Sequence, residues 1–97
     1  MSKTELISNI YNKMESEIPK SMIRDIIDFF INEVKESLLK KEVVHIKGFA
    51  TFKTKFVEAK EGESFGKKWS TDAKYVPVIK FSQSFKSQFA SEWLRYS

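Results

Sequence analysis

Residues 43–57 read VVHIKGFATFKTKFV, a stretch in which apolar and polar side chains alternate over much of its length. Its first four residues are mostly β-branched, which favours a strand, and Gly48 permits a turn conformation that other residues resist. Beyond Gly48, Lys53 and Lys55 alternate with aromatic residues and Thr54, the period of two expected in a strand. The stretch therefore predicts a β-hairpin with one core face and one basic face.

The chain downstream of this hairpin supplies an exposed tip and a returning strand. Residues 58–68 read EAKEGESFGKK, are polar and hold two of the three glycines, so we expect an exposed tip near 58–68. Residues 69–81 return with alternating side chains, and Lys74 and Lys80 fall on the same face. We therefore expect the basic face to recur on the returning strand.

Helical periodicity lies on both sides of these strands in the sequence. Residues 3–14 place apolar side chains three and four apart, and a second stripe continues for about five turns from Pro19, which suits a first helical turn. Ser82 can cap a last helix whose aromatic residues lie four apart. The order α-α-β-β-β-α predicts an α+β fold.

The length and the charge distribution limit what the chain can be. With 97 residues it forms a single domain, 1–97, and is marginally stable alone, so we expect an oligomer. Residues 1–42 hold seven basic and eight acidic side chains, whereas residues 43–97 hold ten basic and five acidic ones. The second half therefore faces a polyanion, if any part does. No apolar run approaches the roughly 20 residues of a membrane span, no secretory signal is visible, and a chain without cysteine can work in a reducing compartment.

Four short motifs occur in an order and spacing that are hard to obtain by chance. They are Lys3-Thr4-Glu5-Leu6-Ile7, Phe29-Phe30, Gly48-Phe49-Ala50-Thr51-Phe52 and Val76-Pro77 before Lys80. With these motifs, nearly the whole chain resembles the bacterial HU and integration host factor family of histone-like, DNA-bending proteins.

The resemblance implies an HU-like intertwined dimer with two N-terminal helices, a three-stranded antiparallel sheet with a protruding β-arm, and a C-terminal helix. Residues 1–42 would form the helical dimerisation base, residues 43–81 the sheet saddle and arm, and residues 82–97 the last helix. Two arms would embrace double-stranded DNA through its minor groove. The partner subunit would be a second copy, giving a homodimer, or a paralogue, giving a heterodimer.

The arm departs from the family's usual pattern at its tip. The family carries several Arg residues there and a proline that wedges between base pairs, whereas this chain has no Arg between residues 25 and 94 and no proline in the arm. Phe65 lies at the polar tip near two glycines and is a candidate wedge, because architectural proteins insert Phe between base steps. The alternative is that Phe65 packs on Trp69 or Phe56 within the arm.

Lysines of the saddle and arms are the side chains expected on phosphates, because a basic surface gains affinity by releasing the counterions condensed on DNA. Read without the resemblance, these lysines would sooner be assigned to solvating an exposed sheet face. Lysine also lacks the planar fork of Arg, so we expect weak sequence preference. The expected DNA-binding residues are Lys3, Lys47, Lys53, Lys55, Lys60, Lys67, Lys68, Lys74, Lys80 and Lys86. The expected dimer core consists of Phe29, Phe30, Val34, Phe49, Phe52, Ile79 and Phe85.

The sequence offers no catalytic or cofactor site. His45 is the only histidine, and a metal site beside it would need carboxylates alone, so we expect a solvated or packed strand residue. No P-loop is present, and no nucleophile is paired with a histidine base. We therefore expect a cytoplasmic, nucleoid-associated protein that is not an enzyme and needs no metal, cofactor, membrane or small-molecule substrate.

Two functions from other classes stay open at this point. A structural or anchoring protein could keep the fold and have lost DNA binding, as the acidic Glu58, Glu61 and Glu63 in and beside the expected tip suggest. A binder of single-stranded nucleic acid could use Phe65, Trp69 and Tyr75 as stacking platforms. Salt dependence and competition between duplex and single strands distinguish these functions from duplex binding.

Overall fold

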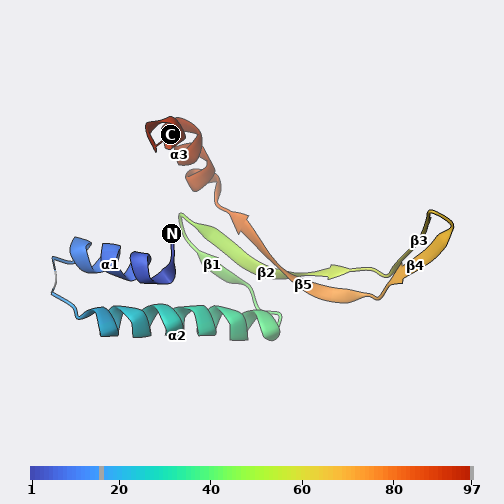
Figure 1. Cartoon of the computed structure of the whole chain (residues 1–97), viewed down its shortest axis with the longest axis horizontal. Helices are drawn as coiled ribbons and strands as arrows, with labels where there is room; N and C mark the ends of the chain where they lie inside the picture. Colours follow the sequence, from blue (N-terminus) through green and yellow to red (C-terminus); the bar gives the residue numbers. More distant parts are fainter. Residues whose placement is uncertain (16, 97) are drawn as a thin grey trace. The chain divides into compact units, whose positions relative to one another are not determined.

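The computed structural model describes residues 1–15 and 17–96, which fall into two compact units, Met1–Glu36 and Ser37–Ser97 (Figure 1). The helices are α1 (Lys3–Lys13), α2 (Lys20–Leu39), α3 (Gln83–Glu92) and a 3-10 turn, η1 (Trp93–Tyr96). The strands are β1 (Val44–Ile46), β2 (Ala50–Val57), β3 (Lys60–Ser64), β4 (Lys67–Thr71) and β5 (Lys74–Phe81). This order confirms the predicted α+β class.

The first unit is a helix hairpin held by side chains at both ends of α1. Lys3 Nζ lies 2.6 Å from Asp28 Oδ1, and Lys20 Nζ lies 5.2 Å from the centroid of the Tyr11 ring. Pro19 immediately precedes α2, in agreement with the predicted helix start. One isoleucine in each helix is buried, Ile7 in α1 and Ile23 in α2.

The end of α2 is fixed by a left-handed residue. Lys41 has a φ of 62°, and the amide of Glu42 donates a hydrogen bond to the carbonyl of Ser37 at 2.9 Å. This bond satisfies one of the carbonyls that a helix leaves unpaired at its end. Lys41 Nζ lies 4.2 Å from the centroid of the Tyr75 ring on β5, a cation–π contact within the second unit.

β1, β2 and β5 form an antiparallel sheet in that order. β1 and β2 are joined through Gly48, whose φ of 79° is a conformation that glycine adopts without strain. β2 and β5 pair along their whole length, with Lys53 opposite Val78 and Lys55 opposite Val76. The predicted three-stranded sheet is therefore confirmed, with β2 at its centre.

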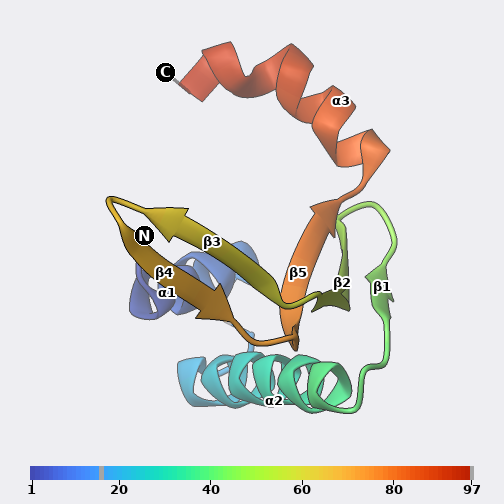
Figure 2. The same cartoon turned by 90° about the vertical axis from the view of Figure 1, so that its right-hand side faces the viewer.

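β3 and β4 pair with each other as a separate two-stranded hairpin, the arm (residues 60–71), which leads away from the three-stranded sheet (Figures 1 and 2). Most of the predicted tip, 58–68, is therefore paired strand, and only two residues form the turn. Polar composition indicated exposure correctly but not the turn, because backbone pairing needs no apolar side chains. Phe65 and Gly66 have φ values of 53° and 76°, as in a type I′ turn.

Aromatic rings connect α3 to the sheet. The ring centroids of Phe49 and Phe81 lie 5.8 Å apart, and both rings contact Phe85 of α3, at 6.2 and 5.5 Å. Ser82 caps the helix as predicted, since its Oγ accepts a hydrogen bond from the amide of Phe85 at 3.1 Å. The cap and the ring contacts together fix where α3 begins and how it leaves β5.

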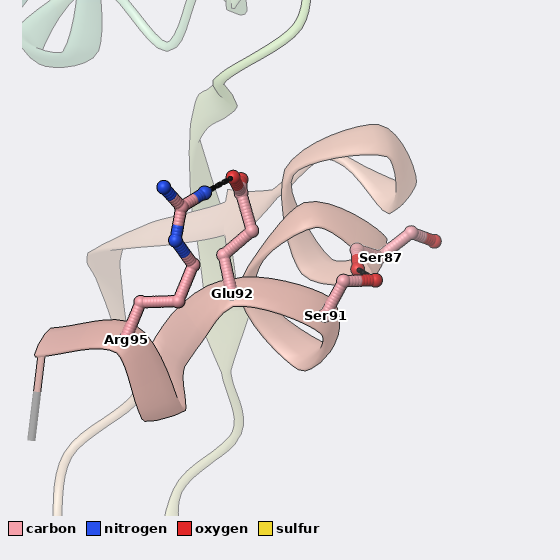
Figure 3. Close-up of polar contacts among 4 residues, drawn as sticks. All are labelled: Ser87, Ser91, Glu92 and Arg95. Atoms are coloured by element: carbon pink, nitrogen blue, oxygen red, sulfur yellow. Dashed lines mark hydrogen bonds and ion pairs between the residues drawn. The ribbon is translucent and has the colours of Figure 1, made fainter.

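Polar side chains near the end of α3 bond within the helix (Figure 3). Ser91 Oγ donates a hydrogen bond to the carbonyl of Ser87 at 3.1 Å, and Arg95 Nη1 lies 3.1 Å from Glu92 Oε1. These local bonds accompany the change from α-helix to the 3-10 turn η1.

A single chain leaves much of its apolar surface exposed. Among the described residues, the buried hydrophobic side chains are Ile7, Ile23 and Ala50. One side of the sheet, called here the apolar face, consists of Ala50, Phe52, Thr54 and Phe56 on β2 and Tyr75, Pro77, Ile79 and Phe81 on β5. Most of its large side chains are exposed, with Ile79 at 57% and Phe56 at 50%. The chain alone therefore does not cover the face that its sequence pattern assigns to a core.

Candidate nucleic-acid interface

The other side of the same sheet carries the lysines. Directly paired residues share a face, so the register of β2 and β5 defines the lysine face without ambiguity. It consists of Thr51, Lys53, Lys55 and Val57 on β2 and Lys74, Val76, Val78 and Lys80 on β5. All four lysines are exposed. The predicted recurrence of the basic face on the returning strand is confirmed.

The register keeps these four charges from opposing one another directly. Each lysine pairs across the ladder with an uncharged residue, as Lys53 does with Val78 and Lys80 does with Thr51. Like charges placed directly opposite would destabilise the sheet. Every residue of β2 and β5 is described and none is acidic, so the sheet offers four cations without a neutralising carboxylate. Such a surface suits a polyanion.

The arm adds three lysines that the sequence assigned to phosphates. Lys60 lies on β3, and Lys67 and Lys68 lie on β4; all three are exposed. The arm also carries two glutamates, Glu61 and Glu63. The charge of the arm is therefore mixed, unlike that of the lysine face.

Phe65 stands at the tip of the arm with its side chain fully exposed, at 103% of the reference area. The alternative prediction, that Phe65 packs on Trp69 or Phe56, is wrong, because a packed ring would lose accessible surface. The turn conformation explains the difference, since a left-handed residue in a two-residue loop has no directly paired strand neighbour to pack against. Phe65 remains available to a partner.

Three predicted DNA contacts lie outside the sheet and arm. Lys3 is in the first unit, where its ion pair with Asp28 partly neutralises it. Lys47 is exposed in the turn between β1 and β2. Lys86 lies on α3 and lines a hollow together with phenylalanines of α3 and β5. None of these three belongs to β2 or β5, the strands whose register defines the lysine face.

The residues predicted for the dimer core differ in how far a single chain buries them. Phe49, Phe52 and Phe85 contact other aromatic rings within the second unit. Phe29 and Phe30 of α2 are 70% and 48% exposed. The remaining predicted core residues are the half-buried Val34 and the exposed Ile79. The ring contacts of Phe49, Phe52 and Phe85 therefore form within a single chain, whereas Phe29 and Ile79 stay more than half exposed.

Two features near the candidate interface were not assigned from the sequence. Lys41 contacts Tyr75 of the sheet, and Trp69 lies against Gly62 across the arm. The second follows once the turn is known, because Gly62 and Trp69 are equally distant from the Phe65–Gly66 pair and face each other across the hairpin.

His45 has a local structural environment. Its Nδ1 lies 2.8 Å from Thr51 Oγ1, its direct partner on β2. Across residues 1–15 and 17–96, no three His, Cys, Asp or Glu side chains gather closely enough to hold a metal ion. Over the same ranges, none of the helices combines the length and apolarity needed to cross a bilayer.

Comparison with known proteins places this geometry in context. Residues 1–90 match the family model described as Bacterial DNA-binding protein. The chain is 34% identical over 90 residues to DNA-binding protein HU from Clostridium pasteurianum, covering 91% of this chain and 97% of that protein. It is 28% identical over 90 residues to integration host factor subunit alpha from Buchnera aphidicola subsp. Acyrthosiphon pisum (strain Tuc7), covering 91% of this chain and 86% of that protein. Its fold is similar to that of an Anabaena HU–DNA cocrystal structure, with a TM-score of 0.82 at 22% identity, covering 93% and 98% of the two chains.

Proposed function

The chain belongs to the family of bacterial DNA-binding proteins, and on that premise we propose that it binds duplex DNA with little sequence specificity and bends it. The observation that carries the proposal is the lysine face, four exposed cations on paired strands that hold no acidic residue. Neutralising phosphates with such a surface releases condensed counterions, whatever the base sequence. The family is one of architectural DNA-binding proteins rather than of enzymes, so the action is mechanical.

The second subunit is most simply another copy of this chain. The apolar face exposes Ile79 and Phe56, and α2 exposes Phe29 and Phe30, more apolar surface than a monomer usually leaves to water. A symmetric dimer buries such surface on both subunits at once. Relatives named as integration host factor subunits alpha and beta also make a heterodimer with a paralogue a defined alternative.

The phosphate contacts of the dimer would come from both chains. On the sheet they are Lys53, Lys55, Lys74 and Lys80, on the arm Lys60, Lys67 and Lys68, and in flanking elements Lys3, Lys47 and Lys86. Lysine acts on phosphate as a compact point charge, whereas Arg fits a narrow minor groove with a planar fork. A surface built from lysine therefore positions DNA without reading its sequence closely.

Phe65 supplies the mechanical step in this proposal. An apolar wedge inserted between base pairs unstacks them and kinks the duplex, and the bent DNA contacts more protein. Phe65 fits this role because it is fully exposed at the end of the arm and has no packing of its own. The duplex DNA of a bacterium lies in the nucleoid. We therefore place the protein in the cytoplasm, associated with the nucleoid, and propose that it needs no membrane, cofactor or small-molecule substrate.

Duplex binding across a salt series tests the proposal. We expect labelled plain and nicked duplexes to bind at low salt and to lose affinity by about 10³-fold or more between 50 and 200 mM salt, the range for six or more phosphate contacts. If neither the plain nor the nicked duplex binds at low salt, the proposal is contradicted and a structural or anchoring role is left. Stronger binding of a single strand than of the duplex in competition would contradict it in favour of single-strand binding.

A further inference from the structure

The two faces of the arm differ in charge. Successive residues of a strand point to opposite faces and directly paired residues share one, so the register divides the hairpin into two sets. One set, called here the indole face, consists of Lys60, Gly62 and Ser64 on β3 and Lys67, Trp69 and Thr71 on β4. The other, the acidic face, consists of Glu61 and Glu63 on β3 and Lys68 and Ser70 on β4. The indole face thus holds cations without a carboxylate, whereas carboxylates predominate on the opposite face.

Trp69 is held on the indole face by Gly62. A Cβ atom at position 62 would collide with the indole ring and would lie 2.9 Å from its Nε1 atom, so only glycine leaves the ring where it is. The ring covers the glycine backbone, which is half-buried, while Trp69 itself stays 46% exposed. Aromatic cover of a glycine in a neighbouring strand is a recognised stabilising device in sheets. Here the exposed part of the Trp69 ring also presents an apolar surface in the middle of the indole face.

Lys68 is separated from the other arm lysines by this division. Its direct partner across the hairpin is Glu63, and Glu61 lies on the same face. Opposite charges that face each other across a strand pair attract, so the two carboxylates on this face offset the charge that Lys68 could offer to a phosphate. A phosphate approaching this face would also be repelled by both glutamates.

We propose that the arm meets DNA through the indole face alone. Lys60 and Lys67 bind phosphates, Trp69 packs against the sugars and base edges between them, and the acidic face turns to solvent. Indole is suited to this position because it joins a large apolar surface to one N–H donor. The inference rests on the proposed function and deepens it: it adds Trp69 to the contacts and removes Lys68 from the phosphate set.

Matched lysine substitutions test the division between faces. Lys60→Ala, Lys67→Ala and Lys68→Ala remove the same charge from the same hairpin, and the full-length variants are compared on one fluorescein-labelled duplex by anisotropy. For each of the first two variants we expect about tenfold weaker binding and a salt slope flatter by about 1.8, since a dimer loses two contacts at about 0.9 each. Lys68→Ala should bind within about twofold of the wild type and keep its slope.

Fluorescence of Trp69 supplies an independent readout. The chain has two tryptophans, so Trp93→Phe leaves Trp69 as the only indole emitter. We expect the emission of this variant to change in intensity as duplex is added, along the same curve as the anisotropy. Equal losses in Lys68→Ala and Lys60→Ala, or unchanged emission from a protein that binds duplex normally, would overturn the inference and leave the proposed function intact. A wild-type protein that binds no duplex would overturn both.

Discussion

At the scale of single residues, the tip of the arm is where conformation departs furthest from what the residue type prefers. Phe65 has a φ of 53°, and a left-handed conformation costs a non-glycine residue about 1 kcal/mol or more. Its ring gains no burial that could offset this cost. A strained residue with an unburied aromatic ring is a reason to look for an external partner, and the interior of a kinked duplex is an apolar one.

Phe65→Ala should separate bending from binding. Phosphate contacts remain in this variant, so we expect affinity within about tenfold of the wild type. Without the wedge, the bend angle should fall by at least about 20°, the lower end of the kinks that such wedges produce. Energy transfer between dyes at the two ends of a saturated duplex measures the angle. Phe65→Leu, which keeps an apolar side chain, is the control and should bend DNA nearly as much; an unchanged angle in Phe65→Ala would remove Phe65 from the mechanism.

At the scale of elements, the alternation of side chains along the strands was enough to predict the lysine face. The alternation around Lys53 and Lys55 was sufficient to predict the lysine face, because the period of two leaves a strand only two faces. The alternation of residues 69–81 likewise placed Lys74 and Lys80 on that face.

The strand pairing of the arm could not be predicted from the same alternation. Its strands consist of polar residues, so neither of its faces resembles a core, and the composition showed exposure without showing pairing. The turn was also hidden, since a type I′ turn usually has Asn or Gly where this chain has Phe65. Once the pairing is known, the contact between Gly62 and Trp69 follows from the register. Positions outside the strands, such as Lys3 and Lys86, depend on tertiary placement that no local pattern reports.

The turn between β1 and β2 gives a prediction at this scale. Gly48 has a φ of 79°, and a Cβ added there would have no atom within 4 Å, so its substitution changes conformational energy without a clash. Gly48→Ala should therefore lower the free energy of unfolding by about 1 kcal/mol, the strain of a left-handed alanine. Gly48→Asn should lower it by less, because asparagine tolerates this conformation better. Urea unfolding followed by circular dichroism measures both; an alanine variant as stable as the wild type would show that the turn can relax.

At the scale of the whole molecule, the two faces of the central sheet favour opposite environments. The lysine face favours exposure and a polyanion, whereas the apolar face, with Ile79 and Phe56 half or more exposed, favours removal from water. A chain of this length buries too little surface alone to be more than marginally stable. In the proposed dimer, association would cover one face and double the number of lysines on the other, so stability and DNA binding would both depend on it.

Adjacent residues of β5 allow this dependence to be tested with one chemical change. Ile79 lies on the apolar face and Val78 on the lysine face, so Ile79→Gln and Val78→Gln introduce the same amide on opposite sides of the sheet. In a dimer, Ile79→Gln buries an amide without an assured partner in each subunit, at about 1–3 kcal/mol per site, and affects two sites at once. We expect this variant to sediment as a monomer or unfold at micromolar concentration, and to lose duplex binding with it. Val78→Gln should remain dimeric, with a melting temperature that still rises with protein concentration. If Ile79→Gln instead forms a stable dimer that binds duplex as well as Val78→Gln does, the apolar face is not the subunit interface.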